Sequence, residues 1–407
     1  MKLNHGIHLA YCTNIHRGES WLEIFTALEQ HTLAVRERIA PGIPYAIGLR
    51  LSDAASLELM DRATLAAFRQ WLDKHNCYVF TINGFPYGKF HGGRVKEQVY
   101  APDWTTPERL AYTNRLFDIL AKLLPKGLEG SVSTVPCSFK EFIHTPEQEK
   151  AMRDNLWRCV EHIARVSHET GHMMHLGLEP EPLCYLETTK ETIRFFDTFT
   201  REQHFDARIR QHLGVNYDTC HLAVEYEDPA DSLRELQSHQ IRISKLHLSN
   251  ALKVTPTLET RTALAEFADD TYFHQVIVRD SHGRVIRFKD LDLALTSARY
   301  VADHPHVTES GHHVFRNLDT EEWRIHFHIP LHAPTGGLFG NTVDHLLGTL
   351  DWLKENPTLC SHLEMETYTW EVMPPEFKNR SVVDQLVMEY CWTLQRLGER
   401  GLVNIEC

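Results

Sequence analysis

Residues 174–182 read MHLGLEPEP, a short apolar run that ends in glutamates and prolines. The pattern returns in LGVNYD (213–218) and in ISKLHL (243–248), where an apolar run again carries an acidic or histidine side chain near its end. Apolar runs of this length, bounded by turn residues, are typical of buried strands. Because helical stretches separate them, they predict parallel strands whose carboxyl ends carry the functional groups.

Five further apolar runs extend this pattern and raise the number of predicted strands to eight: GIHLAY (6–11), YAIGLRL (45–51), CYVFTI (77–82), GSVSTV (130–135) and HLEMET (362–367). Most of the intervening segments begin with side-chain oxygens that can accept from free backbone N–H groups. These helix starts are Ser20 with Glu23, Thr106-Pro107, Thr145 with Gln148, Thr188 with Glu191, Asp228-Pro229 and Asn341 with Asp344. The alternation of strands and helices predicts a single (β/α)8 barrel, a TIM barrel, over residues 1–407.

One segment, residues 250–340, breaks the alternation between the seventh strand and the seventh helix. Its length of roughly 90 residues is too great for an ordinary connection. It contains a hairpin candidate, FHQVIVRDSHGRVIRF (273–288), and a second short strand, WRIHFHIP (323–330). We expect an insertion folded over the barrel mouth, with a separate small domain as the alternative.

The composition limits the classes of molecule that the protein is expected to bind. The formal charge of −13 argues against a long nucleic acid, which basic surfaces bind, and leaves a small polar metabolite as the expected ligand. No apolar window reaches the ~18 residues of a membrane span, and the amino terminus lacks a signal-peptide core. Nine cysteines without a CxxC pair indicate reduced thiols and a cytoplasmic protein. The oligomeric state stays unknown at this stage.

Four side chains of metal-ligand type fall at predicted strand ends: Glu179, Asp218, His247 and Glu366. Unpaired carboxylates inside a barrel are costly, and a shared divalent cation (Mn, Zn, Mg or Co) would relieve all of them. No organic cofactor is expected. The alternative is a set of separate polar residues in hydrogen bonds. Glu181 and Glu364 share strand parity with two of the four, so either could replace a ligand.

Several motifs resemble a known group. The strand-end glutamates, Asp218 with His221, and the isolated His247 are similar to the xylose-isomerase-like superfamily of TIM barrels, which includes sugar isomerases, ketose epimerases and endonuclease IV. A closer resemblance, to the EboE group of metabolite traffic proteins, rests on HLAYCTNIHRGESW (8–21), NGFPYGKFHG (83–92), GLEPEP (177–182), VNYDTCHLA (215–223) and ETYTW (366–370). It covers the whole chain.

The resemblance implies that the four strand-end residues bind the metal. It also implies that Glu179 and Glu366 are catalytic, as an acid/base pair on a metal-bound ketose, and that His221 touches substrate or a second metal. Endonuclease IV has a comparable motif where HFHIPLH (326–332) stands here. His326 and His328, expected on one face of a short strand, could therefore hold a second metal with His221 and His91. The alternative is that these histidines only cap the mouth through hydrogen bonds.

Weaker signals concern the substrate. His8, Asn83, Lys89 and Glu181 are expected to line a polyol pocket, although surface positions are the alternative for the loop residues. PTGGLFGNT (334–342) runs into a helix start, a place that favours an anion such as the phosphate of a sugar phosphate.

Three functions follow. The first is a metal-dependent isomerase or epimerase of a small polyol, sugar phosphate or cyclitol. The second is a di- or trinuclear metallohydrolase of phosphoester bonds, and the third is a non-catalytic metabolite-binding protein. A single metal with paired glutamates favours the first, whereas several metals around a bridging hydroxide favour the second.

Overall fold

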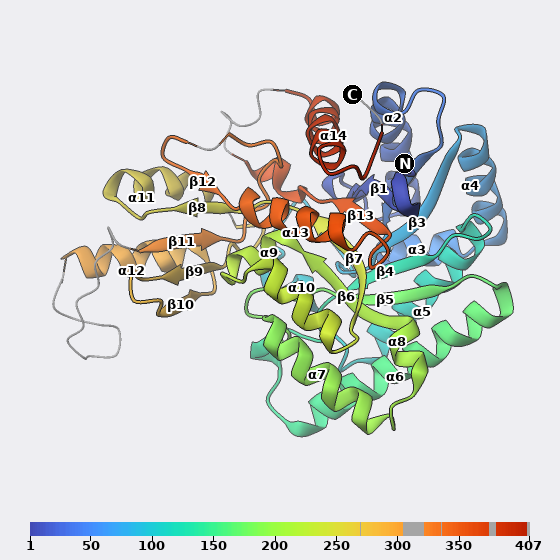
Figure 1. Cartoon of the computed structure of the whole chain (residues 1–407), viewed down its shortest axis with the longest axis horizontal. Coiled ribbons are helices and arrows are strands. Elements are labelled where there is room, and N and C mark those ends of the chain that lie inside the picture. Colours follow the sequence, from blue (N-terminus) through green and yellow to red (C-terminus); the bar gives the residue numbers. More distant parts are fainter. Residues whose placement is uncertain (269, 304–320, 335, 374–379, 405–407) are drawn as a thin grey trace.

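A computed structural model describes residues 1–268, 270–303, 321–334, 336–373 and 380–404 (Figure 1). Its main sheet has eight parallel strands in the order β1-β13-β7-β6-β5-β4-β3-β2. The strands are β1 (His8–Tyr11), β2 (Tyr45–Arg50), β3 (Cys77–Asn83), β4 (Gly130–Thr134), β5 (Met174–Leu178), β6 (Leu213–Asp218), β7 (Arg242–Leu248) and β13 (His362–Met365). A parallel bridge between Cys12 and Gly48 joins the two ends of this order. The strands therefore form a nearly closed barrel, which confirms the predicted fold class.

Helices surround the barrel, and most begin where side-chain caps predict. They are α1 (Trp21–Ala27), α2 (Leu33–Ile39), α3 (Asp53–Leu59), α4 (Arg62–Lys74), α5 (Pro107–Leu123), α6 (Pro146–Thr170), α7 (Thr189–Glu202), α8 (Ala207–His212), α9 (Thr219–Val224), α10 (Pro229–Ser238), α13 (Val343–Glu355) and α14 (Val382–Gly398). Ser20, Thr145 and Thr188 form complete capping boxes. One start is corrected: Thr342, not Asn341, is the residue before α13, because Asn341 extends the short strand β12.

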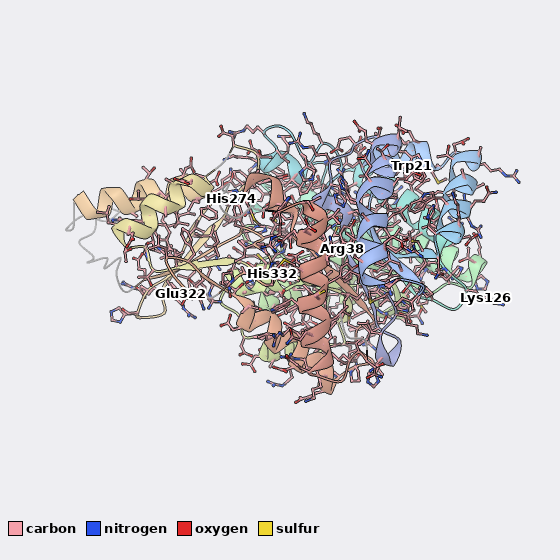
Figure 2. The ribbon with its side chains drawn as sticks, turned by 90° about the horizontal axis from the view of Figure 1, so that it is seen from above. Trp21, Arg38, Lys126, His274, Glu322 and His332 are labelled. Atoms are coloured by element: carbon pink, nitrogen blue, oxygen red, sulfur yellow. The ribbon has the colours of Figure 1, made fainter. Side chains whose placement is uncertain are left out.

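The segment between β7 and α13 forms a second, five-stranded antiparallel sheet in the order β10-β9-β11-β8-β12. Its elements are β8 (Leu252–Val254), α11 (Leu258–Leu264), β9 (Val276–Arg279), β10 (Val285–Phe288), α12 (Leu291–Asp303), β11 (Glu322–Ile325) and β12 (Gly340–Asn341). The β9–β10 hairpin turns at residues 280–283, as predicted. This sheet protrudes at one end of the long axis, and Figure 2 shows His274 and Glu322 at that end with Lys126 at the other.

Ion pairs fasten the second sheet to loops that follow the barrel strands. Arg287 in β10 contacts Glu187 at 2.8 Å and also contacts Glu225, and both carboxylates are buried. A second buried pair joins Lys96 to Asp290. These partners follow the carboxyl ends of β3, β5 and β6, so the insertion is held against that side of the barrel.

Two further expectations can be compared with the described residues. Seven cysteines are buried free thiols, whereas Cys391 is disulfide-bonded, which corrects the expectation that all nine are reduced. Within the described part of the chain, no helix has the length and apolar character needed to cross a membrane.

The buried carboxyl of Glu389 in α14 generates a prediction on stability. It accepts hydrogen bonds from the Thr367 hydroxyl (2.8 Å) and from the Leu331 N–H (3.2 Å), and burial raises its pKa to about 7. A carboxyl group whose pKa is higher in the folded protein than in the unfolded chain contributes stability that is fully present below the unfolded pKa of about 4.5. This stability is lost as the pH rises through the folded pKa of about 7.

Between pH 5 and pH 8, we expect the unfolding free energy of the wild type to fall by about 3 kcal/mol more than that of Glu389→Gln, whose side chain cannot ionise. Urea unfolding at both pH values measures the difference. Glu355→Gln, at an exposed position of α13, is the control and should match the wild type at both. Identical pH dependence in the wild type and Glu389→Gln would contradict the prediction.

Candidate active site

The strand register brings three predicted site residues to one level of the barrel. Asp218 on β6 pairs with His247 on β7, and His247 pairs in turn with Glu364 on β13. Glu366 lies two residues beyond Glu364, so its side chain points to the same side one level higher. Glu179 follows β5 directly, and its N–H donates to the Thr134 carbonyl at 3.1 Å.

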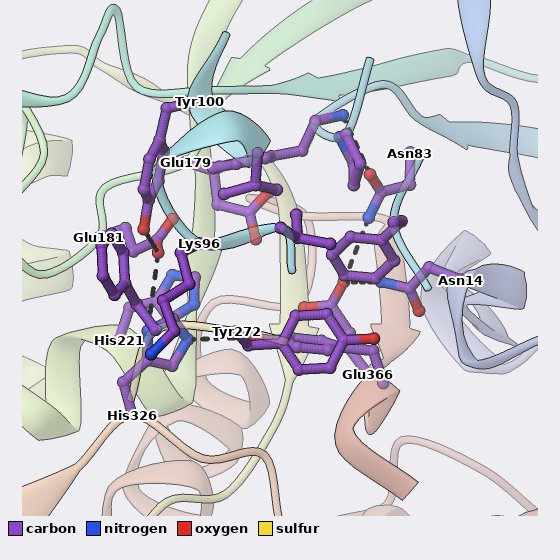
Figure 3. Close-up of a pocket in the computed structure, with 17 residues that line it drawn as sticks. Asn14, Asn83, Lys96, Tyr100, Glu179, Glu181, His221, Tyr272, His326 and Glu366 are labelled. Carbon is purple, nitrogen blue, oxygen red and sulfur yellow. Dashed lines mark hydrogen bonds and ion pairs between the residues drawn. The ribbon is translucent and has the colours of Figure 1, made fainter. Parts of the chain in front are cut away.

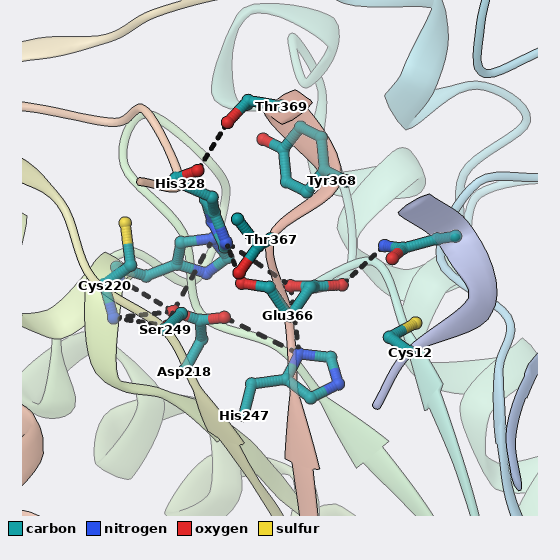
Figure 4. A network of polar contacts seen from close by, with 12 residues as sticks. Cys12, Asp218, Cys220, His247, Ser249, His328, Glu366, Thr367, Tyr368 and Thr369 are labelled. Atoms are coloured by element: carbon teal, nitrogen blue, oxygen red, sulfur yellow. Dashed lines mark hydrogen bonds and ion pairs between the residues drawn. The ribbon is translucent and has the colours of Figure 1, made fainter. Parts of the chain in front are cut away.

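Three carboxylates surround a single nitrogen, Nδ1 of His247. Figure 4 shows two of them, those of Asp218 and Glu366, beside the ring. The distances are 2.9 Å to Glu179 Oε1, 3.3 Å to Glu366 Oε2 and 3.5 Å to Asp218 Oδ2. All four side chains are buried, and one ligand atom from each lies within 4.8 Å of the others. The structure thus brings together the four residues that the sequence singles out as metal ligands.

This group fits a divalent cation. Glu179 Oε2 and Asp218 Oδ2 are buried without a hydrogen-bond partner, although buried carboxylate oxygens normally have one. Three carboxylates and one imidazole are a donor set that suits Mn, Mg, Zn or Co. A cation among them would compensate charges that otherwise repel one another in a low-dielectric site.

The pKa values of His247 and Asp218 also reflect the excess of negative charge at this centre. Burial alone lowers the pKa of His247, but Glu366 and Glu179 outweigh it and hold that pKa well above its usual range. Burial raises the pKa of Asp218, yet the nearby rings of His221 and His247 hold it well below its usual range. Both shifts in pKa have the same cause, which is the number of buried carboxylates gathered around His247.

Glu364 lies on the other side of the same ring. Its Oε2 is 2.8 Å from Nε2 of His247 and 2.5 Å from Nζ of Lys245, and both partners are buried. It therefore holds His247 with Nδ1 toward the three carboxylates. Carboxylates in this position behind a metal-binding histidine orient the ring. Of the two alternatives for the last-strand ligand, the geometry favours Glu366.

Backbone and side-chain donors fix the other carboxylates. Asp218 Oδ1 accepts from the Cys220 N–H (2.7 Å), the His221 N–H (3.0 Å) and the Ser249 hydroxyl (2.5 Å). Glu366 Oε1 accepts from the side-chain amides of Asn14 (2.7 Å) and Asn83 (3.1 Å). Each of these two carboxylates is therefore held through one oxygen, and the second oxygen faces the shared centre.

A cavity lies above this centre (Figure 3). Of the four clustered residues, Glu179 and Glu366 line it, whereas Asp218 and His247 do not. Glu181 lines it as well. Its Oε1 accepts from the Tyr100 hydroxyl at 2.6 Å, and burial raises its pKa to about 7. Glu181 is thus a pocket residue rather than a member of the four.

The predicted second histidine group is brought together in part. Nε2 of His326 and Nε2 of His328 are 3.2 Å apart, and the His221 ring centroid is 4.6 Å from that of His326. Ligand atoms of Asp218, His221 and His328 lie within 4.8 Å of one another. His91 stands apart, because its two ring nitrogens contact the Asn14 carbonyl (2.6 Å) and the Tyr272 hydroxyl (2.5 Å). The expected strand position is corrected: His326 and His328 follow β11, which ends at Ile325.

Of the remaining residues predicted to bind substrate, one lines the cavity and the others do not. Asn83 lines the cavity. His8 does not, because it begins β1, where its Nδ1 is 2.6 Å from the Tyr78 hydroxyl. Lys89 is exposed and lies outside the lining, as do the described residues of the Gly-rich stretch 334–342.

Sequence reasoning did not find several lining residues: Lys96, Tyr100, Tyr272 and Tyr368. Lys96 has a positive φ of 34°, an uncommon value for a residue with a side chain. Its backbone N–H and that of Val95 both donate to the Thr271 carbonyl in the insertion, at 2.9 Å and 2.8 Å. No local sequence pattern predicts these lining residues, because their positions depend on contacts with distant segments of the chain.

Comparisons with known proteins give structural neighbours. No protein-family model matches the chain, and no curated protein matches it. Among solved structures it is similar to an L-ribulose 3-epimerase (11% identity, TM-score 0.48, 98% of this chain and 96% of the other). It is also similar to a xylose isomerase domain protein from Planctomyces limnophilus (13%, 0.49, 91% and 93%). A third is a xylose isomerase-like TIM barrel protein from Mycobacterium smegmatis in complex with magnesium (15%, 0.45, 90% and 87%).

One of these neighbours is described as a xylose isomerase domain protein and another as a xylose isomerase-like TIM barrel protein. The narrower resemblance to the EboE group stays a prediction. With TM-scores below 0.5 and identities of 11–15%, the neighbours assign neither a reaction nor a residue role to this chain.

The position of Glu364 behind His247 can be tested by substitution. Glu364→Gln keeps the volume but removes the charge that balances Lys245 and holds the ring. We expect the affinity for Mn²⁺ to fall about tenfold or more, as for other residues that orient metal-binding histidines. Titration with Mn²⁺, followed by electron paramagnetic resonance, measures this. The control is Glu181→Gln, another buried carboxyl, which should stay within about threefold of the wild type. Equal affinities in all three proteins would contradict a positioning role.

Proposed function

We propose that this chain is a divalent-metal-dependent isomerase or epimerase of a small polyol, sugar phosphate or cyclitol. One observation carries the proposal: of four side chains gathered around a buried centre, the two that reach the cavity are both glutamates, Glu179 and Glu366. Two carboxylates beside a bound substrate can take a proton from one carbon and return it.

Glu179, Asp218, His247 and Glu366 would hold the cation. When bound, the cation supplies Lewis acidity to a carbonyl and a neighbouring hydroxyl of the substrate, which makes the C–H bond between them more acidic. Glu364 and Lys245 lie behind His247 and keep the ring oriented, and neither lines the cavity.

The two glutamates differ in how they are held, which suits different proton-transfer roles. Glu366 Oε1 accepts two amide hydrogen bonds, and these favour the ionised carboxylate. Glu179 Oε1 lies 2.9 Å from Nδ1 of His247, while its Oε2 has no hydrogen-bond partner. For an epimerisation, one carboxylate would take the proton from one face of the carbon, and the other glutamate, in its protonated form, would donate a proton to the opposite face. For an isomerisation, one carboxylate would carry the proton to the neighbouring carbon as the carbonyl moves.

The hydrolase alternative is supported by two further groups that could hold a metal: Asp218, His221 and His328, and Cys220, His326 and His328. Two features count against it. His91 is engaged with Asn14 and Tyr272, and Lys96, the one Lys or Arg among the described lining residues, is paired with Asp290. The non-catalytic alternative would not require paired glutamates at the cavity.

Metal content separates these functions. We expect about one equivalent of divalent metal per chain, lost in His247→Ala and kept in His328→Ala, because His247 is surrounded by three carboxylates. Elemental analysis of the purified, metal-reloaded proteins measures it. Two or three equivalents, reduced by His328→Ala, would favour the hydrolase instead. No metal in any preparation would overturn the proposal.

The role of Glu366 is tested by proton exchange. Glu366→Gln keeps the volume and the possibility of accepting from Asn14, but it cannot take up a proton at neutral pH. We expect exchange of the substrate C–H for deuterium to slow by about 10²–10⁴-fold. Proton NMR in D₂O, with a panel of ketoses and cyclitol ketones, measures the exchange.

The matched control is Glu129→Gln, which alters a carboxylate beside His175 and Arg242, outside the residues that line the cavity. Its exchange rate should equal that of the wild type. If Glu366→Gln retains full activity in this comparison, Glu366 takes no part in proton transfer.

A further inference from the structure

The cavity is chemically divided. Its polar floor comprises Glu366 with Asn14 and Asn83 at one end, Glu181, His221 and His326 at the other, and Glu179 between them (Figure 3). Most of the remaining lining is carbon. We call six of these residues the apolar wall: Phe85, Phe90, Val95, Val99, Tyr272 and Tyr368.

Three rings form the centre of the apolar wall. The centroids of Phe90, Tyr272 and Tyr368 lie 5.2–5.4 Å from one another. They come from the loop after β3, from the insertion and from the segment after β13, so three distant parts of the chain meet there. With Val95, Phe90 and Tyr272 form a hydrophobic cluster separate from the barrel core. Such a cluster, beside a cavity rather than inside the core, is available to a ligand.

The tyrosine hydroxyls of the cavity already have partners. The Tyr272 hydroxyl is 2.5 Å from Nδ1 of His91, and the Tyr100 hydroxyl donates to Glu181 at 2.6 Å. The Tyr368 hydroxyl is 3.4 Å from Nε2 of His326. The wall therefore presents ring and methyl carbons to the cavity rather than hydrogen-bonding groups.

The charged groups of the lining are also engaged. Lys96 pairs with Asp290 in the insertion, and both side chains are buried. His326 is 2.7 Å from Oε1 of Gln275 through its Nδ1, and His221 is 3.1 Å from the Pro180 carbonyl. A phosphate on the substrate would have to compete with Asp290 for Lys96.

The apolar wall and the engaged polar groups determine which kind of substituent on a bound substrate is favourable in this cavity. A free polyol bound at the floor would bury its outer hydroxyls against carbon, and a buried hydroxyl without a partner is unfavourable. An aryl or alkyl group in the same place removes apolar surface from water on both sides of the contact. Aromatic rings also pack favourably against other rings at the spacing that the wall shows.

We infer that the substrate is a polyol or cyclitol that carries an aryl or alkyl substituent, and that the apolar wall binds this substituent. The inference rests on the proposed function for the hydroxy-carbonyl head at the glutamate floor. It narrows that function from free sugars and sugar phosphates to substrates with one polar and one apolar end.

Two probes with the same head test the inference. Dihydroxyacetone and 2-hydroxyacetophenone share a hydroxymethyl ketone, and they differ in bearing a second hydroxymethyl group or a phenyl ring. Their affinities for the full chain loaded with Mn²⁺ are measured by calorimetric titration. We expect 2-hydroxyacetophenone to bind about tenfold more tightly or better, because the wall buries its ring.

Variants of the wall locate the effect. Phe90→Ala removes one ring, and Val99→Thr keeps the shape while adding a hydroxyl, so the fold is preserved in at least the second. Each should weaken the binding of 2-hydroxyacetophenone about threefold or more, and should weaken it more than the binding of dihydroxyacetone, so that the ratio of the two affinities falls. Leu57→Ala, at a side chain 55% exposed on α3, is the control and should keep the wild-type ratio.

The outcomes separate the two proposals. If dihydroxyacetone binds as tightly as the aryl ketone and its C–H exchanges, the proposed function stands and the apolar substituent is overturned. If neither ketone binds, acetophenone, which keeps the ring and lacks the chelating hydroxyl, decides the matter. Acetophenone binding that Phe90→Ala weakens would support the apolar site while the proposed reaction fails. No binding of any probe would overturn both.

Discussion

Burial of three carboxylates around one imidazole nitrogen is the constraint that the rest of this structure accommodates. Glu179, Asp218 and Glu366 all lie within 3.5 Å of Nδ1 of His247. Like charges at such distances repel strongly in a low-dielectric interior, and each ion also loses its hydration. Donors from Asn14, Asn83, Ser249 and the amide groups after Asp218 offset part of this cost. Two carboxylate oxygens of the group, Glu179 Oε2 and Asp218 Oδ2, are left without a hydrogen-bond partner, and the proposed cation would compensate them.

The level below the centre is polar for the same reason. A TIM barrel usually fills its interior with branched apolar side chains. Here Lys245 and Glu364 occupy the interior, and their ion pair holds the rear of His247. Gly48 on β2 leaves the room that this arrangement requires, because a Cβ atom there would lie 2.0 Å from Glu364 Oε1. At this level the barrel therefore has polar instead of apolar packing, and the ion pair gives the His247 ring one orientation.

Patterns of sequence predict the parts of the molecule that depend on local forces. The eight strands follow from short apolar runs, and α1, α6 and α7 begin where capping boxes can form. The four clustered residues also follow, because parallel strands bring their carboxyl ends together. Parity could not separate Glu364 from Glu366, since both point to the same side of β13. Register decides between them, and register depends on pairing between distant strands.

The pocket was harder to predict, because its walls come from long loops whose side chains are placed by partners far along the chain. The sequence predicts Lys89 as a pocket residue, yet it is Lys96 that lines the cavity, paired with Asp290 194 residues away. His8 was placed by its closeness to a strand, but it stands at the beginning of β1 rather than at its end. The insertion supplied no motif for Tyr272, whose position depends on contacts with Phe90 and Tyr368.

Different parts of the chain form the floor and the apolar wall of the cavity. The floor of the cavity comes from strand ends, where rigid neighbours hold each carboxylate, and rigid placement is what proton transfer requires. The apolar wall comes from the insertion and from two long loops, which can change without disturbing the strands. Because Lys96 with Asp290 and Arg287 with its two glutamates fasten the insertion to the barrel, the wall is assembled before a substrate arrives. Binding energy from an apolar substituent would then be available to position the polar end over Glu179 and Glu366, rather than being spent on ordering the wall.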